Sequence, residues 1–142
     1  DLLGHLKSRG IHSDYTGVDI LPEMIEEARR RHPEGRFVSA DLLEEHRFAP
    51  GSFDIVYSSG MFNLKVGDNR QFFKRWLEEF FRIARGQVIF NLLDPDRPVQ
   101  RDIYYYADPQ EVQQVVRQFT PEIEIIYDYV PKDYTVFARV MS

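Results

Sequence analysis

The sequence has 142 residues, of which 43% are hydrophobic and 29% are charged. A chain of this length and composition can bury one hydrophobic core, so we expect a single domain over residues 1–142. The 18 basic and 23 acidic side chains give a formal net charge of −5 at pH 7. This balance argues against nucleic acid and anionic membrane as partners, because both attract basic surfaces.

The residue types exclude several kinds of chemistry. Cysteine is absent, which rules out disulfides, thiolate metal sites and cysteine nucleophiles. The four histidines lack the spacing of metal ligands, so no metal site is expected. No apolar run approaches the roughly 20 residues needed to span a bilayer, and no signal peptide is recognised. We therefore expect a cytoplasmic protein.

Helical and strand-like segments alternate along most of the chain. Apolar residues at helical spacing predict helices, and short apolar runs bounded by turn residues predict strands. In chain order the predicted elements are a helix over 2–9, a strand over 15–20, a helix from Pro22, strands over 36–41 and 53–59, a helix after Asp68, a strand over 87–93, a helix after Asp108, and strands over 123–130 and 134–140. The short connection at 131–133 predicts an antiparallel hairpin for the last two strands.

Two of the predicted helices begin at recognisable caps. Asp68 precedes the first, with Gln71 three residues further on, and Asp108 precedes the second, followed by Pro109. The aromatic stripe from Phe72 to Phe81 is expected to lie in the core.

Alternating strands and helices predict an α/β fold with a mostly parallel sheet and helices on both faces. Ligands of such sheets bind beyond the carboxyl ends of the strands. The candidate functional positions are therefore Asp19, Asp41, Ser58 to Gly60, and Asn91 to Leu93.

Acidic residues end two successive predicted strands. Asp19 could accept hydrogen bonds from both hydroxyls of a ribose, or could complement the dipole of the helix that begins at Pro22. Asp41 could lie near an adenine amino group, or could cap the short segment that begins at Leu42. Together the two carboxylates favour a nucleoside-type ligand bound across the strand ends.

Three segments carry a resemblance to a known family. They are Thr16 to Ala28 (TGVDILPEMIEEA), Phe37 to Leu42 (FVSADL) and Gly51 to Gly60 (GSFDIVYSSG). They resemble the second, third and fourth strands of class I S-adenosylmethionine-dependent methyltransferases, and the terminal hairpin resembles the family's reversed seventh strand. The resemblance implies a Rossmann-like fold and S-adenosyl-L-methionine as the cofactor.

The same resemblance implies roles for individual residues. Asp19 would hold the ribose hydroxyls, with Ile20 in the same cofactor-binding set. Asp41 and Leu42 would face the adenine, and Ser58 and Ser59 would border the methionine moiety. Leu21 stands where the family often has a small polar residue, which puts the side-chain cap of the following helix in question.

The family's first strand and its glycine-rich loop have no counterpart ahead of the first predicted helix. Asp1-Leu2-Leu3 resembles the residues that directly follow that loop. Because this strand is central in the family's sheet, its absence would leave two strands without a common neighbour. We therefore expect an N-terminally truncated domain that binds the cofactor weakly or not at all, is inactive alone, and could form a homo-oligomer through its incomplete sheet.

Four polar residues are candidates for contacting the methyl acceptor. Asn63 could orient a polar substrate, Lys65 could meet an anionic one, and Asn91 ends a strand. Tyr105 could form the wall of a pocket or supply a phenol as a base. Alternatively, the loop after residue 60 is ordered only by packing, and the tyrosine rings pack with their hydroxyls at the surface. The segments 90–93 and 102–109 resemble segments of a bacterial subgroup of these methyltransferases, and no catalytic residue is assigned.

The acidic charge favours a small-molecule acceptor. Two other functions stay open. One is a fragment of a nicotinamide-dependent dehydrogenase, whose second strand also ends in an acid that binds ribose. The other is a catalytically inactive Rossmann-like interaction domain. The second acid at Asp41 and the terminal hairpin favour the methyltransferase over the dehydrogenase.

Overall fold

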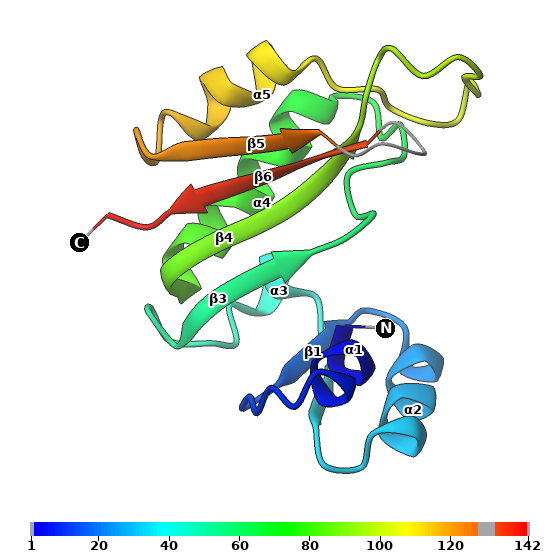
Figure 1. The fold of residues 1–142 in the computed structure, drawn as a ribbon, viewed down its shortest axis with the longest axis vertical. Helices are drawn as coiled ribbons and strands as arrows, with labels where there is room; N and C mark the ends of the chain where they lie inside the picture. Colours follow the sequence, from blue (N-terminus) through cyan, green and yellow to red (C-terminus); the bar gives the residue numbers. More distant parts are fainter. Residues whose placement is uncertain (1, 128–132, 142) are drawn as a thin grey trace. The chain divides into compact units, whose positions relative to one another are not determined.

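The computed structural model describes residues 2–127 and 133–141, which belong to two compact units, residues 1–47 and 48–142 (Figure 1). The elements are α1 (Leu2–Ser8), β1 (Thr16–Asp19), α2 (Pro22–Arg31), β2 (Arg36–Ser39), α3 (Leu42–Glu45), β3 (Phe53–Ser58), α4 (Asn69–Ile83), β4 (Ala84–Leu93), α5 (Pro109–Val116), β5 (Ile123–Tyr127) and β6 (Asp133–Arg139). Each helix and strand expected from the sequence is present, although several begin or end at different residues than predicted. The structure also contains the short helix α3, which was not predicted. Residues 128–130 of the predicted strand over 123–130, and Pro131 and Lys132 of the predicted hairpin connection, lie outside the described residues.

The first unit contains a two-stranded parallel sheet. β1 and β2 pair in register from Thr16 opposite Arg36 to Asp19 opposite Ser39. Leu3, Ile25 and Phe37 form its small buried core. Because the strands are parallel, their carboxyl ends lie at the same edge, which places Asp19 and Asp41 there together.

The second unit contains a mixed sheet in the order β3-β4-β6-β5. β3 and β4 are parallel, and β6 is antiparallel to both of its neighbours. β6 is thus the single reversed strand of this sheet, which confirms the predicted antiparallel pairing of the last two strands.

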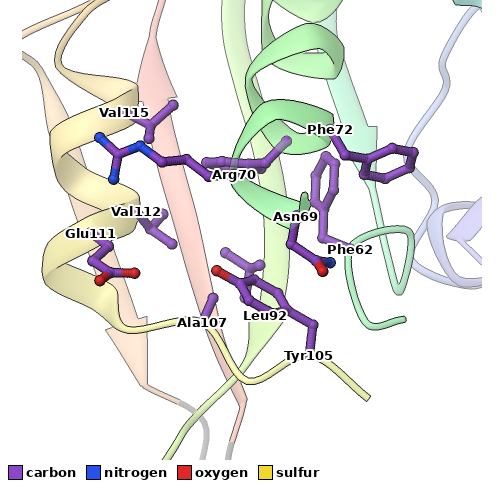
Figure 2. A pocket seen from close by; sticks show the side chains of 11 residues that line it. Phe62, Asn69, Arg70, Phe72, Leu92, Tyr105, Ala107, Glu111, Val112 and Val115 are labelled. Atoms are coloured by element: carbon purple, nitrogen blue, oxygen red, sulfur yellow. The ribbon is translucent and has the colours of Figure 1, made fainter. Parts of the chain in front are cut away.

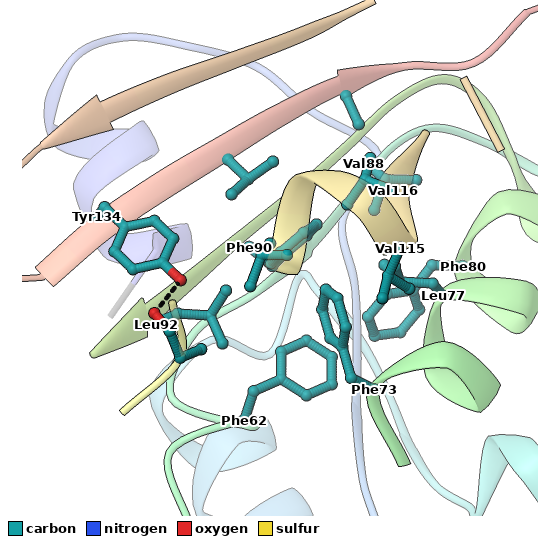
Figure 3. Packing of buried hydrophobic residues seen from close by; sticks show 14 of the residues in the cluster. Phe62, Phe73, Leu77, Phe80, Val88, Phe90, Leu92, Val115, Val116 and Tyr134 are labelled. Carbon is teal, nitrogen blue, oxygen red and sulfur yellow. Dashed lines mark hydrogen bonds between the residues drawn. The ribbon is translucent and has the colours of Figure 1, made fainter. Parts of the chain in front are cut away.

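One face of this sheet packs against α4 and α5 (Figure 3). Alternate residues of the two central strands point into this core and are at most 2% exposed: Val88, Phe90, Leu92, Tyr134, Val136 and Ala138. The aromatic stripe of α4 lies against them, with the rings of Phe73 and Phe90 at 5.3 Å between centroids. The prediction that this stripe is core is confirmed.

The expected helix caps are also present. Asp68 Oδ1 accepts a hydrogen bond from Gln71 N at 3.0 Å, and Asp108 Oδ1 accepts one from Gln110 N at 2.9 Å. Ala84 continues the apolar spacing of α4 in the sequence, but in the structure it begins β4 opposite Phe53. None of the helices in the described part of the chain combines the length and apolarity needed to cross a bilayer.

Gly86 lies where β4 passes close to β3. A Cβ added at Gly86 would lie 2.5 Å from the carbonyl oxygen of Asp54, beside the register shift between Phe53 and Ile55. We expect Gly86→Ala to lower the free energy of unfolding, measured in urea, by about 1–3 kcal/mol, because the backbone must move. Gly67→Ala is the comparison, because its Cβ would meet open space and only its φ of +91° is unfavourable. Full stability of Gly86→Ala would contradict this steric argument.

Candidate functional site

Asp19 stands at the end of β1 and holds the start of α2. Its Oδ1 accepts a hydrogen bond from Leu21 N at 2.9 Å. Leu21 is the N-cap residue of α2, and because its side chain is apolar it makes no side-chain cap bond. Asp19 supplies the side-chain oxygen that accepts a hydrogen bond at this helix start. Among the described residues Oδ2 of Asp19 has no hydrogen-bond partner, which leaves it available to a ligand hydroxyl.

Ile20 follows Asp19 directly at the end of β1. Its side chain is 61% exposed. An exposed aliphatic side chain directly beside an open carboxylate offers a nucleoside an apolar surface and a polar anchor together.

Asp41 caps α3. Its Oδ1 accepts a hydrogen bond from Leu43 N at 3.1 Å, and its own N–H donates to Glu45 Oε2 at 3.0 Å. The capping role that the sequence left open is therefore confirmed, and a contact of Asp41 with adenine stays a prediction. Leu42 as a whole is buried, at 8% exposure. The N–H of Ala40 donates to Asp19 O at 3.0 Å and ties the two strand ends together.

The turn after β3 is held by Asn91 of the neighbouring strand. Asn91 Oδ1 accepts a hydrogen bond from Gly60 N at 2.8 Å, and Asn91 Nδ2 donates to Ser59 Oγ at 3.0 Å. Gly60 has a φ of +78°, a conformation that favours glycine. Ser58 is buried and Ser59 is exposed. Both ends of the Asn91 amide are engaged within the chain, so the structure makes Asn91 a positioning residue for Ser59 and Gly60.

We expect Asn91→Leu to lower the free energy of unfolding by about 0.5–1.5 kcal/mol for each hydrogen bond lost. Asn91→Asp retains the acceptor for Gly60 N and should recover part of the loss. Urea unfolding measures both, with Gln114→Leu on the exposed side of α5 as the control. Equal stability of Asn91→Leu and the natural chain would contradict a stabilising role for the two Asn91 hydrogen bonds.

The loop after Gly60 is joined to the segment 103–105 by backbone hydrogen bonds. Tyr105 N donates to Asn63 O at 2.9 Å and Lys65 N donates to Ile103 O at 3.0 Å, on either side of an antiparallel bridge between Leu64 and Tyr104. The structure thus brings Asn63 and Tyr105 together. Asn63 Oδ1 is buried without a hydrogen-bond partner, whereas the Lys65 side chain is exposed.

Asn69, the first residue of α4, fixes the far end of this loop. Its Nδ2 donates to Leu64 O at 2.8 Å and its Oδ1 accepts from Val66 N at 3.2 Å. Side-chain amides therefore hold the loop at both ends.

A small hollow, with about 20 Å³ of space inside it, lies between the first turns of α4 and α5 (Figure 2). Its lining comes from the loop after β3, both helices, the end of β4 and the segment before α5: Phe62, Asn69, Arg70, Phe72, Phe73, Leu92, Tyr105, Ala107, Glu111, Val112 and Val115. Of the predicted acceptor residues, Tyr105 lines this pocket, while Asn63, Lys65 and Asn91 are not among its lining.

Sequence reasoning missed the two charged residues of the pocket, Arg70 and Glu111. The spacing contained a signal for the first. Arg70 is three residues before Phe73 and seven before Leu77, so it shares the buried face of α4. A cation at the end of an apolar stripe marks the edge of a core that opens to solvent.

Burial raises the pKa of Tyr105, and the nearby carboxylate of Glu111 raises this pKa further. A phenol with a raised pKa stays protonated at neutral pH. Tyr105 is therefore suited to donate a hydrogen bond rather than to act as a base. The neighbouring Tyr134 is fully buried and donates its hydroxyl to Ala107 O at 2.7 Å (Figure 3).

Solved structures share this fold at low sequence identity. The PH0226 protein from Pyrococcus horikoshii OT3 aligns with a TM-score of 0.71 and 15% identity over 99% of this chain and 76% of its own. The 1,6-didemethyltoxoflavin-N1-methyltransferase of Burkholderia thailandensis, solved with 1,6-didemethyltoxoflavin and S-adenosylhomocysteine, aligns at 0.69 and 17% over 99% and 66%. Magnesium protoporphyrin IX methyltransferase of Synechocystis PCC 6803, solved with S-adenosylmethionine, aligns at 0.65 and 14% over 89% and 59%. The chain spans less than two thirds of the length of the last two.

Sequence comparison defines the family. A family model described as a methyltransferase domain matches residues 1–85. The methyltransferase-family protein Rv1506c of Mycobacterium tuberculosis is 30% identical over 151 residues, which cover 99% of this chain and 87% of that protein. The chain belongs to the class I S-adenosylmethionine-dependent methyltransferases. Structural homologues in this family bind S-adenosylmethionine or S-adenosylhomocysteine.

Proposed function

We propose that this chain binds S-adenosylmethionine and acts in the transfer of its methyl group to a small-molecule acceptor. The observation that carries the proposal is the open carboxylate oxygen of Asp19 at the end of β1, in a chain that belongs to this family. When bound, the cofactor supplies an electrophilic methyl group, so the protein's work is mainly to hold and orient the two reactants.

The proposed cofactor contacts use residues at strand ends. Asp19 would accept hydrogen bonds from the ribose hydroxyls while its other oxygen keeps holding the start of α2. The exposed Ile20 would pack against the adenine. Asp41 and Leu42 would face the adenine, as the family resemblance implies. The family resemblance assigns Ser58 and Ser59 to the methionine moiety, with Ser59 held by Asn91.

A small-molecule acceptor is supported by the net charge of −5, which disfavours nucleic acid. It is also supported by the Burkholderia structural neighbour, which holds 1,6-didemethyltoxoflavin. Asn63, Lys65 and Tyr105 lie on one bridged pair of segments and are the proposed acceptor-side residues.

Ligand-observed NMR with S-adenosylhomocysteine and NAD tests the proposed function. We expect S-adenosylhomocysteine to bind and NAD not to displace it. Displacement of S-adenosylhomocysteine by NAD would favour a dehydrogenase.

We expect the affinity to be weak for these 142 residues alone. β1 is hydrogen-bonded only to β2, and β3 only to β4, among the described strands. A sheet edge of this kind is incompletely supported and can pair with a further strand. Pairing through these edges with a second copy of the chain would appear as a mass that rises with concentration in sedimentation experiments.

A further inference from the structure

The direction of the hydrogen bonds around Asn91 is fixed by backbone chemistry. β3 and β4 are parallel and lie side by side, with Ser58 opposite Phe90 (Figure 1). Ser59 and Asn91 are the next residues along the two segments. Gly60 N lies 2.8 Å from Asn91 Oδ1, and a backbone N–H can only donate. The oxygen of the Asn91 amide must therefore face Gly60.

The nitrogen of the same amide then decides the role of Ser59. Asn91 Nδ2 lies 3.0 Å from Ser59 Oγ, and because an amide –NH₂ group only donates, Ser59 Oγ is the acceptor. Ser59 is exposed, and within the described residues its hydroxyl proton has no acceptor. This proton is therefore available to a ligand that offers an acceptor atom. A ligand group that can only donate would leave the proton without a partner once water is displaced.

We propose that Asn91 holds the Ser59 hydroxyl as a hydrogen-bond donor to the carboxylate of the cofactor's methionine moiety. The inference rests on the proposed function, which assigns Ser59 to this moiety, and it names the group that Ser59 binds. The methionine moiety carries a carboxylate, which only accepts hydrogen bonds, and an ammonium, which only donates them. The direction set by Asn91 selects the carboxylate. Ser59 is thus the binding residue, and Asn91 is a positioning residue that acts through it.

A matched pair of ligands tests this assignment by ligand-observed NMR on the full chain. S-adenosylhomocysteine carries both groups, whereas its decarboxylated analogue keeps the ammonium and lacks the carboxylate. We expect Ser59→Ala to weaken binding of S-adenosylhomocysteine roughly 10-fold and to leave binding of the analogue unchanged. Ser52→Ala is the control, because Ser52 precedes β3 and its hydroxyl donates to Ala49 O. It should change neither affinity.

Asn91→Asp tests the positioning role, because it keeps the shape of the side chain and reverses one hydrogen bond. Both carboxylate oxygens accept, so one can keep the bond from Gly60 N while the other takes the Ser59 hydroxyl proton. We expect Asn91→Asp to weaken binding of S-adenosylhomocysteine at least as much as Ser59→Ala does. The added negative charge contributes to this loss, so Asn91→Asp is also measured in the Ser59→Ala background. The loss should be smaller there, and equal losses in the two backgrounds would overturn the positioning role.

A titration tests the link between Asn91 and Ser59 without any ligand. In Asn91→Asp the Ser59 hydroxyl can donate to the introduced carboxylate, and such a hydrogen bond favours the charged form. Carbon-observed NMR should therefore show that this carboxyl titrates at a lower pH in Asn91→Asp than in the double variant that also carries Ser59→Ala. Equal titration in both would contradict the hydrogen bond between the two side chains and overturn the positioning role of Asn91.

The outcomes separate this inference from the proposed function. If S-adenosylhomocysteine binds the natural chain and Ser59→Ala leaves its affinity unchanged, or weakens the analogue equally, the carboxylate assignment is overturned and the cofactor proposal stands. If neither compound binds the natural chain, the proposed function fails and the carboxylate assignment fails with it. The titration then still decides whether Asn91 directs the Ser59 hydroxyl.

Discussion

Asp19→Asn is expected to weaken S-adenosylhomocysteine binding roughly 10- to 100-fold, because hydrogen bonds to a charged group exceed those to a neutral one by one or more kcal/mol each. The substitution keeps an oxygen that can accept from Leu21 N, so α2 should still begin at Pro22. Ligand-observed NMR reaches the weak affinities expected for this chain. Glu23→Gln, an exposed carboxylate in the first turn of α2, is the control.

A second pair of ligands sharpens this test. Adenosine and 2′-deoxyadenosine differ by one ribose hydroxyl. The natural chain should prefer adenosine, and Asp19→Asn should lose most of that preference if the carboxylate holds the ribose. If both forms of the chain discriminate equally between the two nucleosides, Asp19 serves α2 alone.

Phe90→Ala is expected to lower the free energy of unfolding by about 3–5 kcal/mol. Phe90 is fully buried in the middle of β4, and its ring contacts those of Phe62 and Phe73, with centroids 5.8 and 5.3 Å away. Truncation leaves a cavity that three different segments border. Urea unfolding measures the change.

Two comparison variants separate the effect of the cavity from the effect of removing apolar atoms in general. Phe90→Leu fills most of the space and should lose less stability. Val99→Ala removes apolar atoms from a side chain that is 76% exposed, so we expect little change. A loss below about 1 kcal/mol in Phe90→Ala would show that the core relaxes around the missing ring.

The helices and strands of this fold could be predicted because the residues that define them are close together in the sequence. The Asp68 cap, the stripe from Phe72 to Phe81 and the Pro22 helix start depend on residues within one or two turns of one another. The end of α4 was less readable. Ala84 fits the helical spacing, but it begins β4 because pairing with Phe53, distant in sequence, decides its conformation.

The sequence predicts the location of a site residue well where strand register fixes it. It predicts less well which distant side chains that residue contacts. The parallel register of β1 and β2 puts Asp19 and Asp41 at one edge, as the sequence predicted. The amide of Asn91 bonds to Ser59 and Gly60, which lie more than 30 positions away in the sequence, and a contact of Asn91 with a substrate stays a prediction. Spacing within a segment contains no information about such contacts.

The two asparagines that hold the loop after β3 have a consequence for how acceptor preference can change. The side chains of Asn91 and Asn69 form hydrogen bonds with backbone atoms of the loop and with the Ser59 hydroxyl. The path of the loop is therefore set from outside, by β4 and α4, whereas Met61, Leu64 and Val66 present exposed side chains. Under the proposed function, these three exposed positions are the ones to vary in a library that seeks new methyl acceptors.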